Sequence, residues 1–272
     1  MKRNRNRKRL IKNKTMKQLK AHFKDKNHDT DIIINNTEGE YADSPLSFEI
    51  DGISFLGSAF FDFELADPSC YESAKSKFNI LKWGNFSFFG DHKTPYTYTL
   101  QRFELSVEIP ILAFDKKEEK QTEGILNLHF ELKESDKKGS ICYCDNERVY
   151  FDKPEIYDFS FCVDDKKYIC ENKTAFFETA LNELSEKMAN DYYFMSCFTC
   201  QYSDYSPYGQ DDFGCMLCYK DYKEDCLKVN SKAEYFEHLD GKKCFACQET
   251  FICPEFCLRT ISEGYRGRVK GI

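Results

Sequence analysis

The chain has 272 residues, of which 41% are hydrophobic and 16% are aromatic, so it carries enough apolar side chains to bury a core. This composition excludes a wholly disordered chain, and 13 glycines and 7 prolines are too few for a collagen-like one. The net charge of −7 is unevenly placed: residues 1–26 hold twelve basic residues and one acidic residue, net +11, whereas the remainder holds 27 basic and 45 acidic residues, net −18.

We expect residues 1–44 to form a basic, disordered tail and linker, because they are rich in Lys, Arg, Asn and Asp. Basic tails often contact nucleic acid. A solvated arm without a ligand is the simpler interpretation, because no aromatic residue precedes Phe23 to stack on bases. The acidic body repels phosphates, so nucleic-acid binding is not expected except through residues 1–26.

No run approaches the roughly 18 apolar residues that a membrane-spanning helix needs. A secretory signal needs a continuous apolar stretch after its basic start, but Leu10 and Ile11 are followed at once by Lys12. We therefore expect a soluble, cytoplasmic protein that does not contact membranes.

Apolar residues alternate with polar ones from about residue 45 to 171, which is typical of strands. Phe48 and Ile50 lead into Asp51-Gly52, a strong signal for a two-residue hairpin turn. Further alternating stripes occupy residues 96–100, 103–111, 126–132 and 159–163, with a change of phase near Gln101-Arg102 that indicates a bulge or two separate strands. We predict an antiparallel, sandwich-like β domain over residues 45–171.

A helix is expected after this domain, capped by Asn172 or Thr174. Its apolar positions repeat at helical spacing and are Phe177, Ala180, Leu181, Leu184 and Met188. A second, short helix is expected from Ser231, where Glu234 completes a capping box. The fold class is thus α+β, with residues 172–272 forming a helix and a cysteine-rich, metal-binding, zinc-ribbon-like C-terminal domain.

The cysteines are the most informative feature, since nine of the fourteen lie within residues 197–257. Without a secretory signal the compartment is reducing, which disfavours disulfides. Three C-x-x-C pairs occur, Cys197/Cys200, Cys215/Cys218 and Cys244/Cys247, and the first two are separated by fourteen residues, close to zinc-ribbon spacing. A structural metal site is favoured over plain buried thiols. A redox pair is disfavoured because it needs a βαβ unit.

The same region resembles an uncharacterised bacterial family, a domain of unknown function. The resemblance rests on C-F-T-C-Q-Y-S-D-Y-S-P-Y-G at 197–209, F-G-C-M-L-C-Y at 213–219, Q-E-T-F-I-C-P-E-F at 248–256 and G-Y-R-G at 264–267. The family shows C-x-x-C-x-x-S-D-Y-S-P-x-G, G-x-M-x-C, Q-E-T-x-x-C-P-E-F and a closing G-Y-R-G. The strand-rich half is similar more loosely, and the basic arm does not match.

The resemblance implies metal ligands at Cys197, Cys200, Cys218 and Cys253. Spacing alone favours Cys215 as the fourth ligand, whereas the resemblance favours Cys253, and we follow the resemblance. Four thiolates leave no open coordination position, so the zinc would be structural and not catalytic. The resemblance implies no activity for this chain, because none is established for the family.

Other residues offer weaker candidates for chemistry. Glu249 and Glu255 flank Cys253 but nothing in the sequence makes them converge. Arg259, Arg266 and Arg268 could clamp an anion, but an ion pair with the acidic body is the simpler role. The phosphate-loop, nucleophile-elbow and H-E-x-x-H motifs are absent from the sequence.

We therefore expect a zinc-stabilised protein-interaction module rather than an enzyme. Its acidic body would bind a basic protein partner, as the surface of an immunity or inhibitor protein does. The alternatives are a hydrolase with a site between the two domains and a nucleic-acid-associated zinc-ribbon factor.

Overall fold

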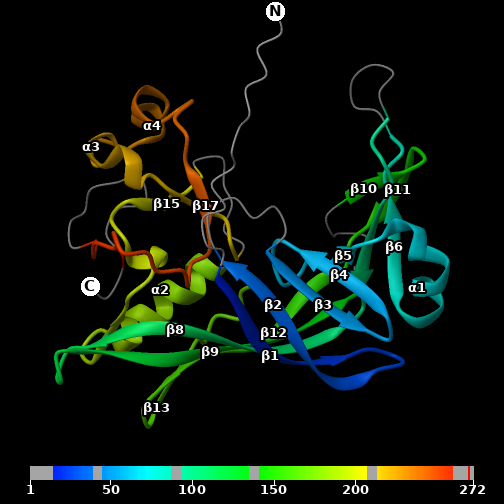
Figure 1. Cartoon of the computed structure of the whole chain (residues 1–272), viewed down its shortest axis with the longest axis horizontal. Coiled ribbons are helices and arrows are strands. Elements are labelled where there is room, and N and C mark those ends of the chain that lie inside the picture. Colours follow the sequence, from blue (N-terminus) through cyan, green and yellow to red (C-terminus); the bar gives the residue numbers. More distant parts are fainter. Residues whose placement is uncertain are drawn as a thin grey trace, which may run out of the picture.

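The computed structural model describes residues 15–38, 45–86, 93–134, 141–206, 213–259 and 269. These residues form a large antiparallel sheet that curls on itself, with helices and a small three-stranded sheet at one end (Figure 1). No helix within the described ranges has the length and apolar character needed to cross a bilayer.

The strands of the main sheet are β1 (Thr15–Lys24), β2 (Asp29–Glu38), β3 (Leu46–Ile50), β4 (Ile53–Gly57), β5 (Glu64–Leu65), β6 (Asn79–Trp83), β7 (Thr97–Gln101), β8 (Glu104–Asp115), β9 (Lys120–Lys133), β12 (Lys153–Val163), β13 (Lys166–Ile169) and β14 (Tyr192–Phe194). The smaller sheets are formed by β10 (Ile141–Cys144) with β11 (Glu147–Tyr150), and by β15 (Ser203–Tyr205), β16 (Met216–Cys218) and β17 (Phe245–Cys247). The helices are α1 (Tyr71–Lys77), α2 (Phe177–Met188), α3 (Lys223–Cys226) and α4 (Lys232–His238), with 3-10 turns η1 (Pro68–Cys70), η2 (Cys197–Thr199) and η3 (Lys220–Tyr222).

The main sheet runs in the order β13-β12-β9-β8-β1-β2-β3-β4-β5-β7-β6, and β14 adds to β8. The prediction of a strand-rich, antiparallel region is confirmed. The strands do not divide into two separate stacked sheets, however, but belong to one continuous sheet. Its curl brings the two halves together, because Phe61 beyond β4 packs edge-on against Phe130 of β9 with ring centroids 4.6 Å apart.

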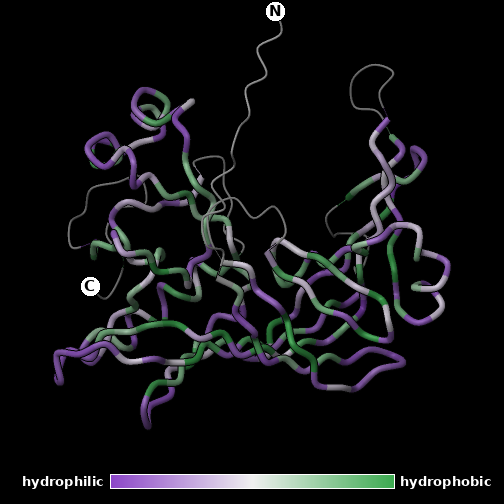
Figure 2. The backbone as a smooth tube through the Cα atoms, viewed as in Figure 1, coloured by the Kyte–Doolittle hydropathy of each residue, from purple (hydrophilic) through white to green (hydrophobic). Residues whose placement is uncertain are grey.

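Alternation of side chains explains the strands at the centre of the sheet. Every second residue is buried along β8 and, from Gly124 onward, along β9, including the predicted stripes at 103–111 and 126–132. Hydrophobic residues follow the middle of these strands, whereas hydrophilic residues gather at the turn between β8 and β9 and at the turn between β1 and β2 (Figure 2). Burial of the apolar face therefore fixes the register.

Turn residues set the strand boundaries as the sequence indicates. Asp51 and Gly52 have φ angles of 52° and 74°, the left-handed pair required by a tight hairpin between β3 and β4. Arg102 has a φ of 54°, and it separates β7 from β8. The change of phase near Gln101-Arg102 thus marks two strands and not a bulge.

A proline opens a gap between β1 and β8. The two strands pair only from Ala21 and Val107 towards the β1–β2 turn, and β14 takes the same edge of β8 farther along. The carbonyl of Leu112 accepts a hydrogen bond from Met195 at that edge, so Pro110, two residues away, faces the same side. Pro110 has no N–H to donate to a strand ladder, which explains why β1 leaves β8 there.

The expectation that residues 1–44 are a disordered tail is wrong for residues 15–38, which form β1 and β2. Leu19, Ala21 and Phe23 alternate with charged residues and are buried, as are Ile32 and Ile34 on β2. The outward-facing charged residues give this stretch the composition of a tail, so composition alone does not reveal the buried stripe. Residues 1–14 and 39–44 lie outside the described residues.

One hydrophobic core runs from the sheet to the cysteine-rich segment. Phe60 beyond β4, Phe177 of α2 and Phe213 before β16 form a group with centroid distances of 4.8 Å from Phe60 to Phe213 and 5.0 Å from Phe177 to Phe213. Met216 and Phe245 belong to the same core. The small sheet of β15, β16 and β17 is therefore packed on the large one through apolar contacts.

The two predicted helices are present. α2 buries all five of its expected apolar residues, but its N-cap is Phe176, and Thr174 accepts a hydrogen bond from the Phe176 amide at 3.1 Å outside the helix. The predicted cap of the second helix is confirmed, because the Ser231 hydroxyl accepts from the Glu234 amide at 3.2 Å at the start of α4.

Deletion of residues 1–26 is expected to unfold the protein, because it removes β1 from the middle of the sheet. Truncating one buried Phe to Ala costs about 3–5 kcal/mol, and a whole domain is stable by only about 5–15 kcal/mol. Circular dichroism with urea titration measures this, and deletion of residues 1–14, which keeps β1, is the control. A cooperative transition after the longer deletion would contradict the assigned place of β1.

Candidate functional site

The cysteine-bearing segments are joined by backbone hydrogen bonds. The Cys197 amide in η2 donates to the carbonyl of Phe251 at 2.6 Å, and the Arg259 amide donates to the carbonyl of Thr199 at 2.8 Å. An isolated bridge joins Cys200 to Leu258. These bonds hold the first C-x-x-C pair against the segment that carries Cys253, more than fifty residues away along the chain.

The small sheet brings in the remaining predicted ligand. Cys218 is the last residue of β16, where it pairs with Ser203 of β15 and Phe245 of β17. Ser203 follows the first C-x-x-C pair closely, and its hydroxyl donates to the carbonyl of Cys197. The ladder therefore places Cys218 beside that pair.

The four predicted ligands gather in one place, from three separate stretches of the chain. Every pair among Cys197, Cys200, Cys218 and Cys253 lies close enough for the thiols to interact electrostatically. The first three are buried and Cys253 is half-buried. A cavity of ≈ 290 Å³ is lined by Cys197, Cys218 and Cys253 together with a fifth thiol, Cys247.

Burial dominates the protonation of Cys200, Cys218 and Cys253. It raises the pKa of Cys218 to about 12, and the charges of the three other thiols add to the rise. Burial likewise raises the pKa of Cys200 and of Cys253. A buried thiolate is costly unless a cation stands beside it, so this environment favours either protonated thiols or a bound metal.

The donor set fits a soft or borderline metal such as zinc, because all four donors are sulfur. Among the described residues, no group of three or more His, Cys, Asp or Glu side chains has its donor atoms already arranged for a metal ion. A metal held by these four thiols would therefore have to draw their sulfur atoms together.

Positive charge stands at the rim of the cavity. Lys220 of η3 lines it, with its ammonium group 5.1 Å from the centre of the Phe245 ring and 3.8 Å from a carboxylate oxygen of Glu255. Lys223 pairs with the same carboxylate at 2.8 Å. Lys220 lowers the pKa of Cys253, opposing the larger effect of burial. These lysines could not be singled out from the sequence, because their place depends on the loop after β16.

Cys215 and Cys244 of the cluster lie elsewhere. Cys215, which spacing alone favours as a ligand, does not line the cavity and packs against the main core. Cys244 packs against a small separate core formed by Tyr219, Cys226, Val229 and Leu239. Cys247, at the end of β17, was not among the predicted ligands, and the one sequence signal for it was its C-x-x-C spacing from Cys244.

Several residues of the family-like motifs serve the fold. Gln248 and Asn36 of β2 exchange two side-chain amide hydrogen bonds of 2.8 and 2.9 Å, and both are buried. Glu249 is completely buried and accepts hydrogen bonds from the Tyr205 hydroxyl at 3.1 Å and the Gly214 amide at 2.7 Å. Glu249 is thus held by partners within the fold.

Arg259 is a buried tie between motif segments. Its guanidinium is 0% exposed and donates to the carbonyl of Ser203 at 2.6 Å and of Cys200 at 3.3 Å. It also lies 3.6 Å from the carboxylate of Asp204. The role expected for Arg259, an ion pair, is present. The closing G-Y-R-G motif and residues 207–209 fall outside the described residues.

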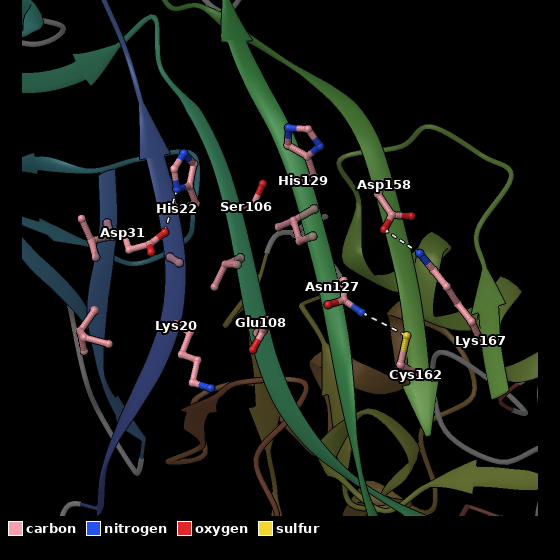
Figure 3. A pocket seen from close by; sticks show the side chains of 15 residues that line it. Lys20, His22, Asp31, Ser106, Glu108, Asn127, His129, Asp158, Cys162 and Lys167 are labelled. Atoms are coloured by element: carbon pink, nitrogen blue, oxygen red, sulfur yellow. Dashed lines mark hydrogen bonds and ion pairs between the residues drawn. The ribbon is translucent and has the colours of Figure 1, made fainter. Parts of the chain in front are cut away.

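A trough lies on the polar face of the main sheet (Figure 3), with a volume of ≈ 650 Å³. The strand register places Asp31, His22, Ser106, His129 and Asp158 in one row across β2, β1, β8, β9 and β12. All five line this trough. His129 lies on the polar face of β9, between the buried Leu128 and Phe130.

The row is built from ion pairs and not from a catalytic triad. Nδ1 of His22 lies 2.8 Å from Asp31 and Nε2 lies 2.9 Å from Asp29, so both nitrogens face carboxylates. Nε2 of His129 lies 2.8 Å from Glu104. His22 therefore presents no nitrogen to the hydroxyl of Ser106, and a serine nucleophile needs a base within hydrogen-bond reach.

His22 is expected to titrate above its ordinary pKa of 6.5, because the hydrogen bond to Asp31 and the pairing with Asp29 favour its charged form. The stability gained from this pairing is complete below 6.5 and disappears as pH rises through the pKa in the folded protein. Histidine NMR measures the titration. Asp31→Asn should lower the pKa of His22, whereas Glu108→Gln, at another carboxylate of the trough, serves as the control. A pKa at or below 6.5 in the wild type would contradict the pairing.

Comparison with curated proteins and with solved structures finds no match. The model of the Family of unknown function (DUF6304) matches residues 17–203, which begin in β1 and end just after the first C-x-x-C pair. The match covers more than two thirds of the chain, including residues 17–26 of the basic segment, and it stops before Cys218 and Cys253. The chain therefore belongs to the Family of unknown function (DUF6304).

Proposed function

We propose that the protein is a zinc-stabilised protein-interaction module, in which a structural zinc ion is held by four thiolates: Cys197, Cys200, Cys218 and Cys253. The observation that supports this most is the mutual proximity of all four thiols, which come from three separate stretches of chain. The four thiols lie within reach of one another's charge, so an ion bound among them would join all three stretches.

The ligand set makes the ion structural and not catalytic. Four thiolates complete tetrahedral coordination and leave no position for water or substrate. Such an ion joins η2, the end of β16 and the loop after β17, and its binding energy becomes folding energy for that part of the chain. Lys220 at the rim offsets part of the negative charge of a four-thiolate centre.

The interaction role is supported by charge. Residues 27–272 carry a net charge of −18, which attracts a basic partner and repels nucleic acid. An immunity or inhibitor protein that covers a basic toxin is one form of such a module.

Protein purified without an affinity tag under reducing conditions is expected to contain about one zinc per chain by elemental analysis. Cys218→Ser and Cys253→Ser should lose most of the metal, because each removes one of four ligands. Cys215→Ser is the matched control, a change in the same stretch outside the cavity, and should retain it. Loss of zinc from Cys215→Ser with retention by Cys253→Ser would overturn this ligand set.

A basic partner protein is expected to co-purify with the full chain from native cells at low salt and to dissociate at high salt, because screening weakens charge pairing. Mass spectrometry of the eluate identifies the partner, and its binding to the purified chain is then measured against ionic strength. Recovery of the chain alone at low salt, or an affinity for the partner that does not change with salt, would contradict the acidic interaction surface.

A further inference from the structure

Cys247 is a fifth thiol at the proposed metal site. It is buried at the end of β17 and lines the same ≈ 290 Å³ cavity as Cys197, Cys218 and Cys253. Its thiol is hydrogen-bonded to that of Cys197, and it also lies near Cys218. A tetrahedral zinc ion needs only four thiolates, so one thiol in contact with a ligand is left over.

The cavity gives a small oxidant access to this pair. Its volume exceeds by several times the roughly 30 Å³ that one water molecule occupies, so a molecule of similar size such as hydrogen peroxide fits. All the cysteines of the chain are present as free thiols. Of the four proposed ligands, Cys197 is the one whose thiol is hydrogen-bonded to the thiol of Cys247. Cys197 is therefore the ligand placed to form a disulfide with Cys247.

We propose that Cys197 and Cys247 form a reversible disulfide on exposure to hydrogen peroxide, and that this withdraws Cys197 from the metal and releases the ion. This inference rests on the metal site of the proposed function. It makes the interaction module sensitive to peroxide, since loss of the ion loosens η2, β16 and the loop after β17.

The chemistry balances with peroxide as the only oxidant. The thiolate sulfur of Cys197 attacks one oxygen of the peroxide, the O–O bond breaks, and a sulfenic acid forms while hydroxide leaves and takes a proton from solvent to become water. The thiol sulfur of Cys247 then attacks the Cys197 sulfur, the S–O bond breaks, and the hydroxyl group leaves as a second water molecule with the proton of the Cys247 thiol. Two electrons pass from the two sulfurs to the peroxide, and the solvent proton replaces the one that Cys197 gave up on binding zinc.

The test uses the full-length, reduced, zinc-loaded protein with hydrogen peroxide added after desalting. A chromogenic chelator follows zinc release, and mass spectrometry of alkylated peptides maps the disulfides. The wild type should release zinc and yield a peptide joining Cys197 to Cys247. Cys247→Ser should keep its zinc at rest and release it about tenfold more slowly with peroxide, because the sulfenic acid has no partner thiol. Cys244→Ser, the other member of the same C-x-x-C pair, should behave as the wild type.

Three results would overturn this inference: release from Cys247→Ser at the wild-type rate, a disulfide joining a different pair, or absence of zinc from resting Cys247→Ser, which would make Cys247 a ligand. Wild-type protein that holds no zinc when reduced contradicts the proposed metal site instead. Peptide mapping of that protein still decides whether Cys197 and Cys247 pair.

Discussion

Four cysteines from three stretches of a chain can come together only if those stretches are tied to one another, and the buried guanidinium of Arg259 ties the first C-x-x-C pair to the segment that carries Cys253, beside the backbone hydrogen bonds between them. It bonds the carbonyls of Cys200 and Ser203 and faces the carboxylate of Asp204. Removing one partner from such a buried pair costs about 3–5 kcal/mol, because the other charge is left without compensation. Arg259 therefore helps to hold the first C-x-x-C pair against the end of the segment that carries Cys253.

The cysteine-rich end is joined to the sheet by a second buried polar contact. Asn36 and Gln248 satisfy each other's amide groups, so truncating either would leave an unpaired buried group at a cost of about 1–3 kcal/mol. Around them the apolar core continues without interruption from Phe60 to Met216. The hairpin of β1 and β2 thus positions Gln248, which follows Asn36 by 212 residues.

Local patterns predicted the elements whose residues alternate cleanly. The stripe at 126–132, the Asp51-Gly52 turn and the apolar face of α2 are all present, because each depends on neighbours within a few residues. β1 and β2 were missed because Lys20 and His22 and the other outward residues gave that stretch the composition of a tail. The convergence of Cys247 on the cavity could not be foreseen, since it depends on β17 pairing with β16.

X-ray absorption spectroscopy at the zinc edge, on untagged protein purified under reducing conditions, tests the central claim most directly. Coordination by four thiolates predicts a shell of four sulfur atoms at about 2.3 Å, with no lighter ligand. A shell containing nitrogen or oxygen at about 2.0–2.1 Å would contradict a closed, structural centre. Protein without zinc would contradict the centre altogether.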